Sequence, residues 1–281
     1  MKKLLIASTA LVLSAGFASA QVTLGGSANM GVKYDGGAPV GTDKASLHYE
    51  IDFDIKGSGT TDGGLTFGAS VDVDNTNGTA AAGTDGEVFI SGAFGTLTVG
   101  GVDDANDGIG FADPGFDGIG VDDDAESGKG AGNSQDIAFS TTFDMVTLVV
   151  AASSTSDDVS VAVFYNGGNF NAGVGFADND NGASAVALEI GGKFGDVSGN
   201  LFFADKTSAG GVNSTGVGVD VTYSMGATSI VLAAGDTDAA GDEADFGIGA
   251  TYDLGGGAKL GGAIGSVDGE TKADFGINFS F

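Results

Sequence analysis

Apolar and polar residues alternate one by one through much of this chain, and the pattern is clearest at the C-terminus. Apolar side chains occupy every second position there, namely Ala273, Phe275, Ile277, Phe279 and Phe281. Successive side chains of a β-strand point to opposite faces of its sheet, so this spacing predicts a strand with one apolar and one polar face. The same alternation recurs within 47–56, 65–73, 159–165, 217–223 and 244–252.

Sixteen strands are predicted when these segments are combined with shorter apolar runs between turn residues. Their approximate ranges are 22–34, 44–56, 64–74, 86–92, 96–101, 135–142, 145–153, 158–165, 169–177, 183–192, 197–205, 214–224, 228–234, 243–252, 258–266 and 271–281. Tight turns such as Gly195-Asp196 and Gly226-Ala227 alternate with longer connections rich in Gly, Asp, Asn and Thr. An even strand number with turns of alternating length is typical of a transmembrane antiparallel β-barrel. A miscounted hairpin would give 14 or 18 strands.

The polar faces of these strands favour a water-filled lumen over a water-soluble sandwich. They carry glycine, serine, asparagine and aspartate in place of the usual mixture of lysine and glutamate. The 53 glycines exceed what a helical protein would contain, and they suit tight turns and closely packed strands. Since sixteen to eighteen strands leave an aqueous channel, the predicted all-β fold is that of an open barrel.

The first twenty residues read as a secretory signal peptide. Lys2 and Lys3 precede a mostly apolar stretch, and Ala18-Ser19-Ala20 forms a small-residue cleavage site. The mature barrel is then expected to comprise residues 21–281. No later run approaches the roughly 20 apolar residues that a membrane-spanning helix needs.

Charge and composition exclude several classes of function. The mature part carries 38 carboxylates and 8 lysines, a net charge of about −30 by that count, so nucleic acid is a poor partner. Cysteine is absent, which removes disulfides, thiolate metal sites and cysteine nucleophiles. Arginine is absent as well.

One connection, Val102–Ser134, is much longer than the others and shows no periodicity. Its apolar residues Phe111, Phe116 and Ile119 suggest that it packs against another part of the protein, and its one basic residue is Lys129. Loops of this length are usually functional or disordered, and a solvated surface loop is the alternative reading. Its acidic residues are Asp103, Asp104, Asp107, Asp113, Asp117, Asp122, Asp123, Asp124 and Glu126.

The chain resembles the bacterial general porins, particularly the trimeric sixteen-stranded porins of alphaproteobacteria. The resemblance rests on 59–70, on 86–100 with its Phe94-Gly95 turn, on 252–257 and on the terminal Phe281. It implies that the third loop, here 102–134, folds into the lumen and narrows it, and that the protein is a homotrimer. It further implies a passive channel of the bacterial outer membrane, surrounded by lipid, for ions and small hydrophilic solutes.

The sequence departs from that family at the pore wall, where the family has a cluster of arginines. The second strand here presents His48, Glu50, Asp52, Asp54 and Lys56, and Lys33 faces them from the first strand. Acids on both the loop and the wall predict a constriction that attracts cations and excludes anions.

Other chemistry finds little support. The single histidine, His48, and the absence of a Gly-x-Ser-x-Gly motif argue against a serine hydrolase, so no catalytic residues are expected. No cofactor is predicted, although calcium is a candidate ligand of Asp122, Asp123, Asp124 and Glu126, because hard cations take several oxygen ligands. Two alternatives remain: a plugged outer-membrane barrel acting as an adhesin or enzyme, and a secreted acidic calcium-binding β-protein.

Overall fold

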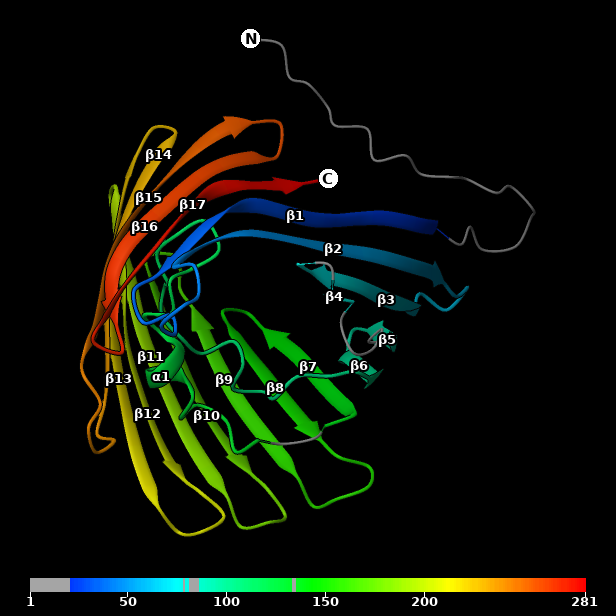
Figure 1. Cartoon of the computed structure of the whole chain (residues 1–281). Helices are drawn as coiled ribbons and strands as arrows, with labels where there is room; N and C mark the ends of the chain where they lie inside the picture. Colours follow the sequence, from blue (N-terminus) through cyan, green and yellow to red (C-terminus); the bar gives the residue numbers. More distant parts are fainter. Residues whose placement is uncertain (1–20, 78, 81–85, 133–134) are drawn as a thin grey trace.

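The computed structural model describes residues 21–77, 79–80, 86–132 and 135–281, and these form one closed antiparallel β-barrel (Figure 1). The predicted signal peptide and the last two residues of the predicted loop, 133–134, lie outside the described residues. Consecutive strands pair around the wall, and β1 closes it against β17, with Ser27 opposite Ser280. No helix of the described residues is long and apolar enough to cross a membrane.

The wall consists of sixteen strands, which confirms the predicted number over 14 or 18. Every predicted segment corresponds to one strand, and the largest boundary difference is the extension of β2 from residue 56 to Thr60. The strands are β1 (Gln21–Asp35), β2 (Ala45–Thr60), β3 (Thr66–Thr76), β5 (Gly86–Gly92), β6 (Gly95–Gly100), β7 (Ile137–Phe143), β8 (Val146–Ala152), β9 (Val159–Asn166), β10 (Phe170–Asp178), β11 (Ser184–Phe194), β12 (Val197–Thr207), β13 (Asn213–Met225), β14 (Thr228–Thr237), β15 (Asp245–Gly255), β16 (Ala258–Val267) and β17 (Glu270–Ser280).

Two short elements were not predicted from the sequence. The two-residue strand β4 (Thr79–Ala80) pairs with the end of β3, and β5 takes the next place in the wall. The four-residue helix α1 (Asp123–Glu126) lies within the long loop. Each is too short for a periodic pattern to develop.

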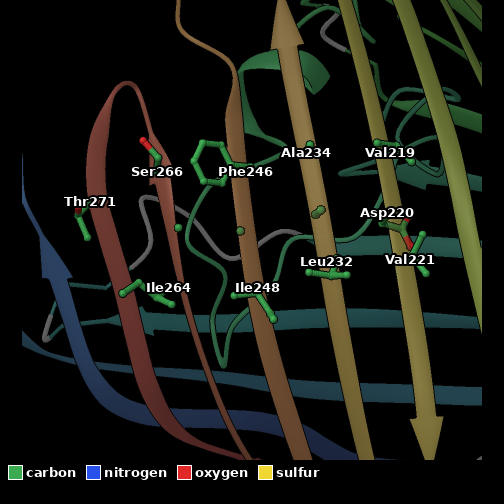
Figure 2. A pocket seen from close by; sticks show the side chains of 13 residues that line it. Val219, Asp220, Val221, Leu232, Ala234, Phe246, Ile248, Ile264, Ser266 and Thr271 are labelled. Atoms are coloured by element: carbon green, nitrogen blue, oxygen red, sulfur yellow. The ribbon is translucent and has the colours of Figure 1, made fainter.

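The outward face of the barrel is apolar, as the alternation predicts. Figure 2 shows part of this face, where large side chains of β13–β16 line a groove of about 660 Å³. Val219, Leu232, Phe246 and Ile264 all project into it and are substantially exposed. A band of exposed apolar side chains fits contact with lipid and not with water.

Short turns close one end of the barrel, and positive backbone φ angles make this tightness attainable. Asp144, Gly195 and Gly226 adopt φ angles of 56°, 64° and 62° in the turns β7–β8, β11–β12 and β13–β14. Glycine reaches this region without steric strain, and aspartate tolerates it better than most residues. Most connections follow the predicted alternation of short turns with longer loops, but the two-residue β16–β17 turn at the long-loop end departs from it.

The hydrophobic core lies inside the barrel, between the wall and the loop that joins β6 to β7. Buried Ile109, Phe111, Ile119, Val121 and Ala125 of the loop pack against wall residues of β11, β12, β14 and β16, namely Ala187, Phe202, Ala204, Ala233 and Val267. The long third loop is thus folded into the lumen, as Figure 1 shows, and is not a solvated surface loop.

Candidate pore constriction

The loop between Gly100 and Ile137, called the constriction loop below, is fastened to the inner wall through its own backbone. The N–H of Ala105 donates to Ser160 Oγ on β9 at 2.8 Å, and that of Gly110 donates to Glu189 on β11 at 3.2 Å. Ala112 N–H donates to Asp220 on β13 at 3.2 Å. The loop therefore crosses several strands of one half of the barrel in order.

Asp274 on β17 is the most heavily used anchor. Its Oδ2 accepts the N–H groups of Phe116 at 2.9 Å and Asp117 at 3.1 Å, and its Oδ1 accepts that of Ala263 at 2.8 Å. Asn278, also on β17, donates to the carbonyl of Phe116 at 2.6 Å. Asp274 is 6% exposed, so its carboxylate serves to hold the loop and contributes little surface to the lumen.

Inward-facing glycines give the loop room to approach the wall. A Cβ atom at Gly218 would lie 2.1 Å from the ring of Phe111, and one at Gly276 would lie 2.7 Å from the ring of Phe116. Such distances are far below van der Waals contact, so only glycine fits these wall positions. Further inward glycines that lie close to the loop are Gly175, Gly216, Gly235, Gly247, Gly261 and Gly265.

The tip of the loop meets the wall at Asp117. Lys33 Nζ of β1 lies 2.5 Å and His48 Nε2 of β2 lies 2.9 Å from Asp117 Oδ2, and Asn29 of β1 donates to its Oδ1 at 2.9 Å. The ring of Phe116 makes an edge contact with His48, with centroids 6.0 Å apart. The structure thus brings predicted loop and wall residues together at one point.

The remaining wall acids of β2 face the lumen beside this point. Glu50 accepts hydrogen bonds from Asn29 at 3.2 Å and Thr76 at 3.1 Å. Asp52 and Asp54 stand opposite the acids Asp74 and Asp72 of β3. Lys56 lies 3.2 Å from Asp54, so a single lysine accompanies these four aspartates along the two strands.

Comparison with known proteins agrees with this arrangement. A family model described as Gram-negative porin matches residues 7–272. The chain belongs to the Gram-negative porin family. The porin of Rhodobacter capsulatus is 30% identical over 316 residues, covering 93% of this chain and all of that protein, and the porin of Fuscovulum blasticum is 28% identical with the same coverage. A variant of Rh. blastica porin superposes with a TM-score of 0.79 at 24% identity, covering 92% of this chain and 100% of that one.

Family membership makes this porin an outer-membrane channel protein. The acidic residues of its constriction loop lie in different environments. Asp113 accepts the N–H groups of Gly120 at 2.8 Å and Val121 at 3.1 Å, which closes a turn inside the loop. Glu126 accepts the N–H of Phe111 at 2.8 Å and pairs with Lys129 Nζ at 2.7 Å. These two acids stabilise the loop itself.

Other loop acids of the porin are more open to the lumen. The side chain of Asp107 is 65% exposed, and Lys129 Nζ lies 3.8 Å from it. Asp103 and Asp123 are also exposed. Asp104 is half-buried and accepts the N–H of Asn106 at 2.9 Å.

Asp122 lies in the most unfavourable environment for a charged carboxylate. Burial, followed by the neighbouring charges of Asp113 and Glu126, raises its pKa to about 7. Burial also raises the pKa of Asp104, Asp113 and Asp124. The charge of the porin's loop therefore depends on pH near neutrality.

The four carboxylates considered for calcium are not gathered around one point. Asp124 instead groups with Asp242 of the β14–β15 loop and Asp268 of the β16–β17 turn, with ligand atoms within 4.8 Å of one another. A second group of this kind among the described residues is His48, Glu50 and Asp117, where Lys33 already neutralises charge.

The wall anchors Glu189, Asp220 and Asp274 of the porin were not predicted from the sequence. An inward acid that holds a loop has the same place in the alternating pattern as one that lines a channel. The available signal was their surroundings, because Gly216 and Gly218 precede Asp220, and Gly276 follows Asp274, at successive inward positions.

Proposed function

We propose that this porin is a passive, water-filled diffusion channel that prefers cations. The observation that carries the proposal is the acidic composition of both sides of the constriction, with Asp107 and Asp117 on the loop and Glu50, Asp52 and Asp54 on the wall. The nearby basic side chains are Lys33, His48, Lys56 and Lys129. The arginine cluster that would balance such acids in related porins is absent from the sequence.

The physical basis for selectivity is the negative potential of closely spaced carboxylates in a narrow lumen. Such a ring attracts cations and repels anions without binding either tightly. Screening shortens the reach of this potential from about 30 Å at 0.01 M salt to about 3 Å at 1 M. Cation preference should therefore be strong in dilute salt and weak in concentrated salt.

An open channel is supported by the placement of the constriction loop. Its anchoring contacts follow the wall from β9 through β11, β13 and β17 to β1 and β2, so the loop runs around the inside of the wall and does not cross the lumen directly. We propose that ions and small hydrophilic solutes pass through the part of the lumen that the loop leaves open, beside the acids of β2 and β3. Permeation then requires no cofactor and no catalytic residue.

The oligomeric state and export route follow the family resemblance. We propose a homotrimer in the outer membrane, exported with residues 1–20 as a cleaved signal peptide. Light scattering of the detergent-solubilised protein tests the trimer, and N-terminal sequencing tests cleavage before Gln21. A monomeric mass would contradict the first, and an intact Met1 would contradict the second.

Single-channel recording in planar bilayers separates the channel from a plugged adhesin or enzyme. Large ohmic current steps from the purified mature protein are expected of an open diffusion channel. Little or no current from barrels that resist protease as folded, inserted protein would contradict it and favour the plugged barrel. A protein that stays soluble without detergent would instead favour the secreted calcium-binding alternative.

A further inference from the structure

A polar pocket lies on the inner wall, on the short-turn side of the constriction loop. It has a volume of about 380 Å³ and is formed by β9–β12 together with the β9–β10 turn. Pockets of about 300–1,000 Å³ commonly hold small molecules. Four asparagine side chains line it: Asn166, Asn169, Asn171 and Asn200.

The pocket adjoins the constriction directly. Glu189, which lines it, is the wall acid that accepts the N–H of Gly110 from the constriction loop at 3.2 Å. Phe164, also in the lining, lies so close to Gly108 of the loop that a Cβ there would be 3.1 Å from the ring. A solute that passes the constriction towards the short turns therefore meets this pocket next.

Several of the lining side chains converge over two inward glycines, Gly173 and Gly191. The ring of Phe164 and the side chain of Glu189 both lie against Gly173, within 3.1 Å of where its Cβ would be. The amides of Asn171 and Asn200 meet above Gly191, and Asn171 Nδ2 lies 3.3 Å from Asn200 Oδ1. An aromatic surface and a row of amides thus lie side by side.

The charge of the pocket differs from that of the constriction. Glu189 contributes one negative charge and Lys193 one positive charge, so the lining is balanced where the constriction is strongly acidic. A charged solute would gain little from such a lining. A neutral solute faces no electrostatic penalty.

The chemistry of the lining matches a hydroxyl-rich molecule. Each hydroxyl is both donor and acceptor, and an amide side chain offers both a carbonyl oxygen and an NH2 group in a fixed plane. Ser198 adds a hydroxyl, Glu189 an acceptor and Lys193 a donor. The ring of Phe164 adds an apolar surface to the lining for the C–H groups of a sugar.

We propose that this pocket is a weak binding subsite for neutral sugars on their way through the channel. The inference rests on the proposed diffusion function and deepens it by naming a solute class. Weak binding next to the constriction raises the local concentration of the solute without trapping it. The subsite would enrich sugars over neutral solutes that lack hydroxyls.

The test uses sucrose as the probe in single-channel recordings of the mature protein. Sucrose is expected to reduce the ion current in a saturable way, beyond the effect of viscosity. A polyethylene glycol of equal hydrodynamic size, which offers ether oxygens and few donors, should reduce it only in proportion to its concentration. Equal, non-saturating effects of the two solutes would overturn the proposal.

A variant pair locates the effect. Asn171→Ala combined with Ser198→Ala removes amide and hydroxyl partners, and two lost hydrogen bonds should raise the half-blocking sucrose concentration about five- to tenfold. Thr142→Ala, which removes an inward hydroxyl of β7 outside the pocket, should leave that concentration unchanged. Unaltered blockade in the double variant would contradict the subsite.

The two proposals fail in distinguishable ways. Absence of current in potassium chloride alone would reject the diffusion channel. Normal current with no saturable sucrose effect would reject the subsite and leave the channel intact.

Discussion

Acidic side chains of this barrel differ in what they do, according to what their oxygens accept. Asp274, Asp220 and Glu189 accept backbone N–H groups of the constriction loop and so fix its position. Asp52 and Asp54 face other carboxylates across the β2–β3 pair and supply charge to the lumen. A count of acids therefore overstates how many of them act on permeating ions.

Removing the Asp274 carboxylate should loosen the loop tip. Asp274→Ala leaves three backbone N–H groups without their acceptor, each at a cost of about 1–3 kcal/mol if it stays buried. We expect a larger and noisier single-channel conductance in 1 M salt, where the lost charge itself is screened. Asp196→Ala, in an exposed turn, is the matched control, and a conductance equal to that control would argue against the anchoring role.

Asp122 gives the loop a pH dependence of predictable sign. Its pKa is raised to about 7, so the folded protein holds this proton more tightly than the unfolded chain. Stability from this group is therefore greatest at low pH and declines as pH rises from about 4, its ordinary pKa range, to about 7.

Asp122→Asn should slow hydrogen exchange of the Gly120 and Val121 amides at pH 8, after correction for intrinsic exchange rates. The advantage should shrink as the pH is lowered from 7 towards 4, where the native carboxyl is already neutral. The control substitution is Asp123→Asn at the exposed neighbouring residue, which should slow hydrogen exchange of these amides less. If the slowing of hydrogen exchange by Asp122→Asn instead increases as the pH is lowered, the predicted pH dependence is contradicted.

Among the elements of the fold, the strands were predictable from the sequence, but the position of the constriction loop on the inner wall was not. Alternation along β1–β17 specifies which side chains face lipid, because a shift of one residue would turn every apolar side chain inward. The glycines of the inner faces were visible in the sequence as polar-face positions. Their purpose is apparent only when Phe111 and Phe116 are seen lying on them.

Filling one of these glycine positions should push the loop into the channel. Gly218→Ala places a methyl group 2.1 Å from the ring of Phe111, and because the wall behind it is a hydrogen-bonded sheet, the loop must move. Overpacking of this kind costs about 1–3 kcal/mol. We expect a lower single-channel conductance.

Gly57→Ala is the control for that substitution, since nothing lies within 4 Å of a Cβ at Gly57. It should conduct like the native protein. If the Gly218→Ala variant also has the native conductance, the close packing of Phe111 against the wall does not determine the channel width.

For the whole molecule, the sequence was sufficient to predict the barrel and its sixteen strands. The resemblance to porins predicted that the loop folds into the lumen. The anchoring residues were not identified, because backbone N–H donors carry no side-chain signature and the neighbouring inward glycines were the one available signal. The meeting of Lys33, His48 and Asp117 joins residues far apart in the chain, and no spacing rule connects them.

The constriction of this channel is acidic on both sides. The most direct test is the reversal potential of the reconstituted protein across a potassium chloride gradient, measured first in dilute and then in concentrated salt. We expect a strongly cation-selective potential in dilute salt that fades as ionic strength rises. Anion selectivity in dilute salt, or a potential near zero there, would contradict it.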